Sequence, residues 1–146
     1  MKLIFIYPKF KKFLTDRVAL RERLKKFAVG DYVMPPSLAI PIIVSLTPKD
    51  IEIKLIDDNF GDPIDFDEDA DAVCISFFTP QAARAYYLGN EYRKHGKTVI
   101  MGGFHPTATP DETLQHCDTV CIGEVEPLWS EILNDLKKKS LKKLYK

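Results

Sequence analysis

Five short apolar runs, separated by segments with helical signals, most strongly limit what this chain can fold into. The runs are KLIFIY (2–7), IEIKLID (51–57), AVCISFF (72–78), TVIMGG (98–103) and the shorter TVCI (119–122). Their nearly continuous apolar character is typical of strands that are buried on both faces, as in a parallel sheet covered by helices. The runs therefore predict the strands of a buried sheet.

Four further segments have the start and stop signals of helices. In the first of them, Pro41 is expected in or near the first turn, where a missing N–H is tolerated. The second begins at Thr79, and Gly96 suits its C-terminal cap. The third begins at Thr109, with Glu112 at the capping-box spacing. These signals predict helices over residues 35–48, 79–96, 109–117 and 126–139.

Strands and helices alternate along the chain, which indicates an α/β fold with a Rossmann-like, doubly wound parallel sheet of about five strands. The chain has 146 residues, enough for one domain with a single core, which we expect to span residues 1–139. Residues 9–34 are interpreted as an insertion between the first strand and its crossover helix. In such sheets a ligand binds beyond the carboxyl ends of the strands, where the strand order reverses.

The charge balance and the apolar pattern exclude several kinds of partner. Lys+Arg and Asp+Glu both number 21, so the sequence predicts neither nucleic-acid nor membrane binding. No apolar run reaches the ~18 residues needed to cross a bilayer, and the N-terminal run is too short for a signal peptide. We therefore expect a cytoplasmic protein whose three cysteines are reduced thiols.

Small, hydroxyl-bearing and glycine residues follow the predicted strands and form a candidate rim. Glycines let a large ligand approach the main chain closely, and hydroxyl groups form hydrogen bonds without adding charge. The residues at the five strand ends are Tyr7-Pro8, Asp57-Asp58-Asn59, Ser76 to Thr79, Gly102 to Pro106, and Gly123-Glu124.

Each rim position also has an ordinary structural interpretation. The two adjacent glycines suit a strand-ending turn, and a lone loop histidine such as His105 is often structural. Asp57 and Asp58 suit a solvated turn or a helix cap. Glu124 and Glu126 suit the start of the last helix, because carboxylates interact favourably with the helix dipole there. Both kinds of interpretation remain open at this point.

The sequence lacks the motifs of several well-known kinds of functional site. The chain contains no GxxxxGK[ST], no GxGxxG and no GxSxG, which argues against a phosphate loop, a dinucleotide fingerprint and a nucleophile elbow. A receiver domain needs an aspartate where this chain has Ser76-Phe77. Cys117 and Cys121 lack further ligands at metal-site spacing, so core packing is favoured and no metal site is expected.

The order of three motifs carries a resemblance to a known family. MPPSLAIPIIVSLTP (34–48) is similar to the entry of a first crossover helix, and LIDDN (55–59) to a second strand end. Residues 73–127 contain G-G-x-H-P-T, a P-D-E helix start and G-E-x-E. Together they resemble the N-terminal cobalamin-binding domain of cobalamin-dependent radical SAM proteins, such as anaerobic magnesium-protoporphyrin monomethyl ester cyclases and B12-dependent methyltransferases. The resemblance covers residues 1–7 and 31–146.

This resemblance implies a domain that binds cobalamin, with one corrin face against the carboxyl ends of the strands and the nucleotide tail between strands and helices. The implied cofactor-binding residues lie in three groups. Ser76, Phe77 and Thr79 would line the tail or the ring edge, Gly102, Gly103, Phe104, His105 and Pro106 would form the loop nearest the corrin, and Gly123 and Glu124 would form another wall. None of these residues is expected to be catalytic.

Two family motifs are missing. Without D-x-H-x-x-G, we expect no histidine ligand to cobalt from the loop after the first strand. Without C-x-x-x-C-x-x-C, the 4Fe-4S cluster and S-adenosylmethionine would belong to a C-terminal radical SAM domain of a longer parent enzyme. Residues 140–146 would then begin the linker to that domain, and this fragment alone would not be a catalyst.

Two alternatives of other functional classes are kept. One is a regulatory or interaction module that retains the fold but has lost cobalamin, with Phe77, Phe78 and Phe104 filling the corrin space. The other is a small-ligand α/β enzyme in which His105 works with Asp57 or Asp58, which requires them within ~2.6–3.2 Å of the transferred proton.

Overall fold

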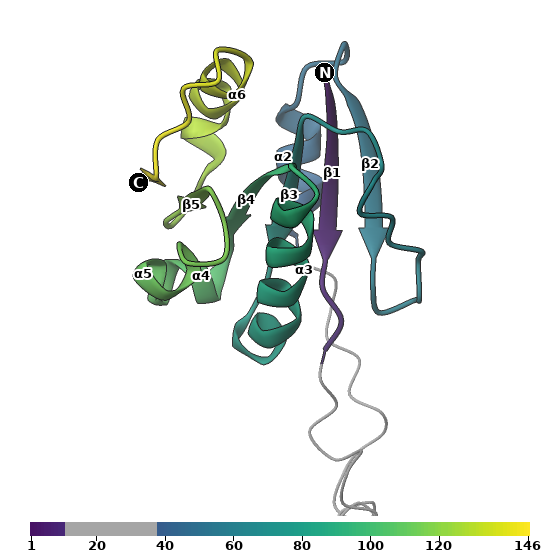
Figure 1. Cartoon of the computed structure of the whole chain (residues 1–146). Coiled ribbons are helices and arrows are strands. Elements are labelled where there is room, and N and C mark those ends of the chain that lie inside the picture. Colours follow the sequence, from purple (N-terminus) through teal and green to yellow (C-terminus); the bar gives the residue numbers. More distant parts are fainter. Residues whose placement is uncertain (11–37) are drawn as a thin grey trace, which may run out of the picture.

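The computed structural model describes residues 1–10 and 38–146, and these residues contain one six-stranded parallel sheet (Figure 1). The expected α/β fold is confirmed, and the strand order is β2-β1-β3-β4-β5-β6. The strands are β1 (Lys2–Tyr7), β2 (Glu52–Asp57), β3 (Ala72–Ser76), β4 (Thr98–Gly102), β5 (Thr119–Cys121) and β6 (Leu144–Tyr145). Most of the expected insertion at 9–34, and the first three residues of the helix expected at 35–48, lie outside the described residues.

The two edges of the sheet differ from the sequence-based expectation. Strand β6 lies within the segment 140–146, which the sequence predicts as the start of a linker, and Cys121 pairs with its Tyr145. Tyr145 is buried. At the other edge, β2 is not buried on both faces, and Leu55 is 57% exposed. An edge strand has a neighbour on one side only, so its apolar run does not guarantee burial.

Helices cover both faces of the sheet, which confirms the doubly wound arrangement (Figure 1). One core packs α3 against the sheet, with Leu88 and Tyr92 fully buried. The opposite core packs α2 and α6 against the sheet, through Ile43 and Ile132 among others. The helical segments are α2 (Ala39–Leu46), the 3-10 turn η1 (Thr79–Gln81), α3 (Ala82–Lys94), α4 (Phe104–Ala108), α5 (Pro110–Thr113), the 3-10 turn η2 (Glu126–Leu128) and α6 (Trp129–Lys137).

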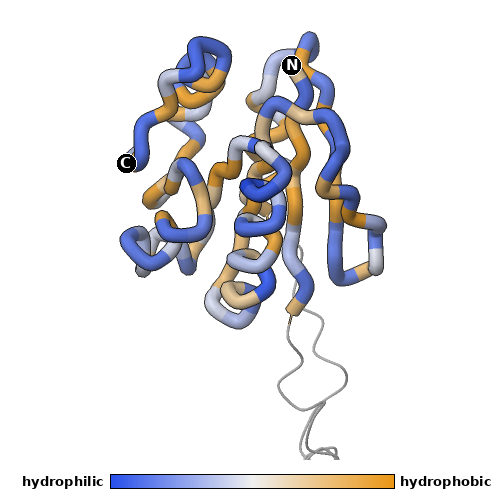
Figure 2. Tube along the Cα trace, in the orientation of Figure 1, coloured by the Kyte–Doolittle hydropathy of each residue, from blue (hydrophilic) through white to orange (hydrophobic). Residues whose placement is uncertain are grey.

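Hydropathy follows these layers. Figure 2 shows hydrophobic residues along the central strands and hydrophilic residues along the connecting loops. In the part of the chain that the structure describes, no helix is long and apolar enough to cross a membrane.

Some of the predicted helix starts and ends are confirmed, and one is wrong. Pro41 lies in the first turn of α2, and Gly96 follows α3 with a φ of 74°, as expected. The capping box at Thr109 is wrong, because the Thr109 side chain makes no cap hydrogen bond. Its hydroxyl donates instead to the carbonyl oxygen of His105, at 3.1 Å. The helical turn α4, which begins at Phe104, occupies a stretch expected to be a loop.

The strand order reverses between β1 and β3. These strands are neighbours, while β2 continues the sheet on one side and β4 on the other. Buried Gln81 joins the two strand ends: its amide donates to the carbonyl oxygen of Pro8, and its Oε1 accepts from the N–H of Phe78 at 2.9 Å. Hydrogen bonds therefore connect the carboxyl ends of the central strands. In α/β sheets, ligands bind at this edge.

Gly89 allows α3 to lie against the segment between α5 and β5, and this contact gives a first prediction. An added Cβ would meet the end of Met101 and would lie 2.5 Å from the carbonyl oxygen of His116. Gly89→Ala should therefore lower the free energy of unfolding by about 1–3 kcal/mol in urea titrations, although alanine is the better helix former.

The reverse change at an exposed site of the same helix, Ala83→Gly, is the matched control. It should cost only about 0.5–1 kcal/mol, since it changes helix propensity without a steric contact. A stabilising Gly89→Ala would contradict the close approach.

Candidate functional site

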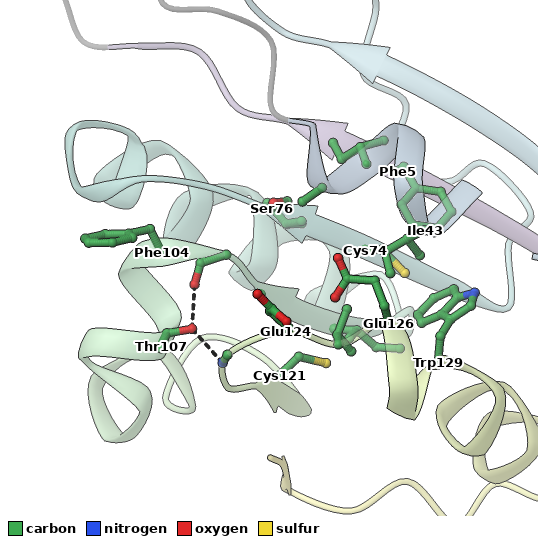
Figure 3. A pocket seen from close by; sticks show the side chains of 18 residues that line it. Phe5, Ile43, Cys74, Ser76, Phe104, Thr107, Cys121, Glu124, Glu126 and Trp129 are labelled. Atoms are coloured by element: carbon green, nitrogen blue, oxygen red, sulfur yellow. Dashed lines mark hydrogen bonds between the residues drawn. The ribbon is translucent and has the colours of Figure 1, made fainter. Parts of the chain in front are cut away.

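A cavity of about 340 Å³ lies on the α2 and α6 face of the sheet, near the carboxyl ends of the strands (Figure 3). Its floor is formed by β1, β3, β4 and β5, its sides by α2 and α6, and its mouth by the ends of β3 and β4 and the segments that follow β4 and β5. The floor and sides consist of Phe5, Ala39, Ile40, Ile43, Cys74, Ile75, Ile100, Cys121, Val125 and Trp129. The mouth consists of Ser76, Gly102, Gly103, Phe104, Thr107, Gly123, Glu124 and Glu126.

The floor is apolar and uncharged. Burial raises the pKa of Cys121 to about 12, and burial likewise moves the pKa of Cys74 well above its usual value. Both groups are therefore neutral thiols near neutral pH, which makes them poor nucleophiles and poor metal ligands. Such a floor suits an uncharged, flat group better than a phosphate or a metal ion.

Trp129 is held in place as a side wall. Its indole N–H donates to the hydroxyl of Thr47 at 2.9 Å, and that hydroxyl donates to the carbonyl oxygen of Ile43 at 2.8 Å. The Trp129 ring also packs against Phe5, with centroids 6.0 Å apart. These contacts tie the start of α6 to the end of α2 and fix the width of the cavity.

Thr107 connects the two segments that border the mouth. Its hydroxyl donates to the carbonyl oxygen of Gly103 and accepts from the backbone N–H of Gly123, each at 2.9 Å (Figure 3). Thr107 lies in α4, so this helical turn acts as a support for the mouth. The G-G-x-H-P-T motif includes this threonine, but its role depends on contacts between distant segments.

Gly103 occupies a position that only glycine fits. Its φ is 107°, a region that L side chains rarely adopt, and an added Cβ would lie 2.9 Å from both the nitrogen and the carbonyl oxygen of Phe77. Backbone hydrogen bonds join the ends of β3 and β4 here. The Phe77 N–H donates to the carbonyl oxygen of Gly102 at 3.2 Å, and the His105 N–H donates to the carbonyl oxygen of Phe77 at 3.3 Å.

Six of the ten residues predicted from the sequence line this cavity, and four do not. The six are Ser76, Gly102, Gly103, Phe104, Gly123 and Glu124. Phe77 is buried in the opposite core, Thr79 is exposed on η1, and His105 and Pro106 are buried beneath the rim. The predicted set therefore corresponds mainly to the mouth of the cavity.

His105 is a structural side chain in this fold. Its Nδ1 lies 3.1 Å from the Thr79 hydroxyl, and its Nε2 lies 3.0 Å from the Tyr86 hydroxyl and 3.2 Å from the Thr109 hydroxyl. Both ring nitrogens are thus engaged, and His105 helps to fix α4 against η1 and α3.

The carboxylates near the end of β2 are also engaged. Asp58 accepts hydrogen bonds from Arg84 at 2.7 and 3.0 Å and from the backbone N–H of Lys9 at 3.0 Å. Burial alone raises the pKa of Asp58, but Arg84 and the Lys9 N–H outweigh it, so this pKa lies below its usual value. Asp57 accepts from the backbone and the side chain of Asn59. These contacts disfavour an acid–base pair between His105 and either aspartate.

The sequence reading missed the apolar floor and sides of the cavity. Cys74, Ile100 and Cys121 belong to runs that were correctly predicted as strands, but their apolar neighbours on the same strands point to the other core. No local pattern separates the two faces of a strand that is buried on both. Cys117 and Cys121 illustrate this, since they lie in opposite cores despite the C-x-x-x-C spacing. The described residues contain no cluster of three or more side chains suited to a metal ion.

Comparisons with known proteins identify the relatives of the chain. A family model described as "B12 binding domain" matches residues 42–133. A bacteriochlorophyllide d C-8(2)-methyltransferase of Chlorobaculum tepidum is 41% identical over 108 residues, which cover 74% of this chain and 24% of that protein. The C-12(1)-methyltransferase of the same organism is 35% identical over 118 residues, covering 80% of this chain and 25% of the relative.

An uncharacterized methyltransferase of Synechocystis is 30% identical over 113 residues, covering 77% of this chain and 20% of the relative. The chain thus spans about a quarter or less of the length of these curated relatives. No solved structure gives a significant match.

The two adjacent glycines of the mouth provide a matched pair for mutation. Gly103→Ala should lower the free energy of unfolding by about 2–4 kcal/mol, because it combines a strained φ with a backbone clash. Gly102→Ala should change stability by less than about 1 kcal/mol, since the nearest atom to its Cβ is 3.4 Å away. Equal effects of both variants in urea titrations would show that the Gly103–Phe77 approach is not tight.

Proposed function

The chain belongs to the B12-binding domain family, and from this premise we propose that it binds cobalamin with the nucleotide tail in the cavity beside Trp129. The corrin ring would lie over the carboxyl ends of the central strands. The observation that carries this proposal is the cavity itself, which opens at the glycine-rich rim and extends between the sheet and its α2 and α6 layer.

The size and lining of the cavity support the tail assignment. Its volume of about 340 Å³ lies within the ~300–1,000 Å³ typical of small-molecule sites. An uncharged benzimidazole ring suits the neutral, apolar floor, with Cys74 and Cys121 as protonated thiols. The hydroxyl groups and the glycine backbone of the mouth suit the more polar part of the tail.

The rim offers an apolar surface for the ring. Phe104 is 70% exposed and stacks on Phe78 with centroids 6.2 Å apart. An exposed phenylalanine stacked on a half-buried one, next to the two glycines, is suited to packing against a large flat ligand, because it loses apolar contact with water on binding. Since Phe77 points into the opposite core and the cavity is open, the alternative of a module whose aromatic residues fill the site is disfavoured.

The histidines argue for a cobalt site without an imidazole ligand from this domain. The chain has three histidines. His105 is engaged as described, His95 is paired with Asp67 at 2.7 Å, and His116 lies 3.1 Å from the side-chain amide of Asn90. None of the three lines the cavity. The chain's own residues would therefore bind and orient the cofactor without coordinating its metal.

The catalytic role would belong to a longer parent protein. Two of the relatives are named as bacteriochlorophyllide methyltransferases, and this chain corresponds to about a quarter of each. We therefore propose a parent B12-dependent radical SAM methyltransferase, whose 4Fe-4S cluster and S-adenosylmethionine bind in a further domain. Cobalamin supplies a cobalt centre that can carry a methyl group, while this domain positions it.

Filling one side of the cavity tests the cobalamin site. The 146-residue chain should give a saturable change in the visible spectrum of hydroxocobalamin. Ala39→Trp places an indole at the edge of the cavity and should weaken this binding about tenfold or more, because it competes for the space of the tail.

The matched control is Ala83→Trp, on the exposed side of α3, which should bind like the wild type. A folded wild-type chain that gives no spectral change would refute cobalamin binding. Equal affinity of wild type and Ala39→Trp would instead refute the placement of the tail.

A further inference from the structure

Glu126 places a carboxylate oxygen in the cavity. No group in the described part of the chain donates a hydrogen bond to this oxygen. Its Oε2 is buried and has no hydrogen-bond partner among residues 1–10 and 38–146. Figure 3 shows the carboxylate directed into the cavity, near Cys74 and Trp129. Buried polar atoms are rarely left without a partner, because the lost hydration is not replaced.

The local helix does not account for this carboxylate. Glu126 begins η2, which is only three residues long, and no side-chain cap hydrogen bond is present. The thiols of Cys74 and Cys121 share the cavity, but a thiol is a weak donor and neither satisfies the oxygen. The sequence reading of Glu126 as a residue that stabilises the helix start is therefore incomplete.

The oxygens of a carboxylate accept hydrogen bonds, so a hydrogen-bond donor is the partner that would satisfy this atom. A phosphate would be repelled at this position, and a purely apolar group would leave the oxygen unsatisfied. A ligand group beside Glu126 would satisfy this oxygen only if it carried an O–H or N–H group. Solvent-exposed Glu124 has no such requirement, since water can satisfy it.

The nucleotide tail of cobalamin contains one suitable group. Its benzimidazole has no N–H and its phosphodiester has no proton near neutral pH, whereas its ribose carries free hydroxyls. Resting on the proposed cobalamin site, we propose that Glu126 accepts a hydrogen bond from a ribose hydroxyl of the tail. Glu126 is then a specificity-determining residue that favours corrinoids with a nucleoside tail over corrinoids without one.

Two substitutions at this position separate hydrogen bonding from shape. Glu126→Leu removes the acceptor, and Glu126→Gln keeps one acceptor oxygen. For the 146-residue chain with hydroxocobalamin, Glu126→Leu should raise Kd about tenfold or more, whereas Glu126→Gln should stay within about threefold of the wild type. Glu131→Leu, which removes a carboxylate paired with Lys142 outside the cavity, is the control for lost charge and should bind like the wild type.

Cobinamide, which lacks the nucleotide tail, is the discriminating ligand. Where the wild type binds it, Glu126→Leu should change that Kd by less than about twofold. An equal loss for both corrinoids would overturn the proposal, because Glu126 would then act on the ring or its amides. If cobinamide is not bound at all, the difference between the leucine and glutamine variants with hydroxocobalamin decides, and equal losses in the two variants overturn the proposal.

The ligand-free chain provides an independent measurement. Because Glu126→Leu removes an unsatisfied buried oxygen, it should raise the Tm of the chain without cobalamin. An unchanged or lower Tm would show that the oxygen is already satisfied and would overturn the proposal. Unchanged cobalamin affinity in Glu126→Leu would refute the role of Glu126 alone, whereas a wild-type chain that binds no corrinoid would refute the proposed function itself.

Discussion

The close approach of the Gly103 backbone to Phe77 is the constraint on which the site depends. It leaves no room for a Cβ and allows the ends of β3 and β4 to exchange hydrogen bonds. The chain can then turn directly into α4, which places the Thr107 hydroxyl between Gly103 and Gly123. One steric requirement thus fixes three segments around the mouth of the cavity. The same turn buries His105 among hydroxyl groups, where it supports the rim from beneath.

The two faces of the sheet perform different tasks. The α3 face is closely packed and carries the hydrogen bonds of Tyr86 and His105, so it holds the rim in place. The α2 and α6 face leaves an apolar cavity, whose width is set by the bond between Trp129 and Thr47. The side chains that line an open cavity lack the packing contacts that they would make in a filled core. The sheet thus has a filled core on one face and an open cavity on the other.

The groups around the cavity are suited to holding a ligand through shape and hydrogen bonds. The thiols of the floor are neutral, the histidines are engaged, and Asp58 is neutralised by Arg84. What the cavity offers is shape, an apolar floor and an acceptor at Glu126. This division of roles agrees with membership in the B12-binding domain family, in a chain that spans about a quarter of its methyltransferase relatives. The reactive groups would then be supplied by the cofactor and by the remainder of the parent protein.

The sequence by itself determined the first five strands, most of the helices and the position of the glycine-rich rim, because apolar runs and turn residues are local signals. Contacts between distant segments decided the rest. Val73 and Cys74 are adjacent in one apolar run, yet they pack into opposite cores, and continuous hydrophobicity does not encode that choice. The sixth strand and the role of His105 likewise depend on neighbours that are far away in the chain. The cavity floor could therefore be identified only from the tertiary structure, since it exists where four strands and two helices meet.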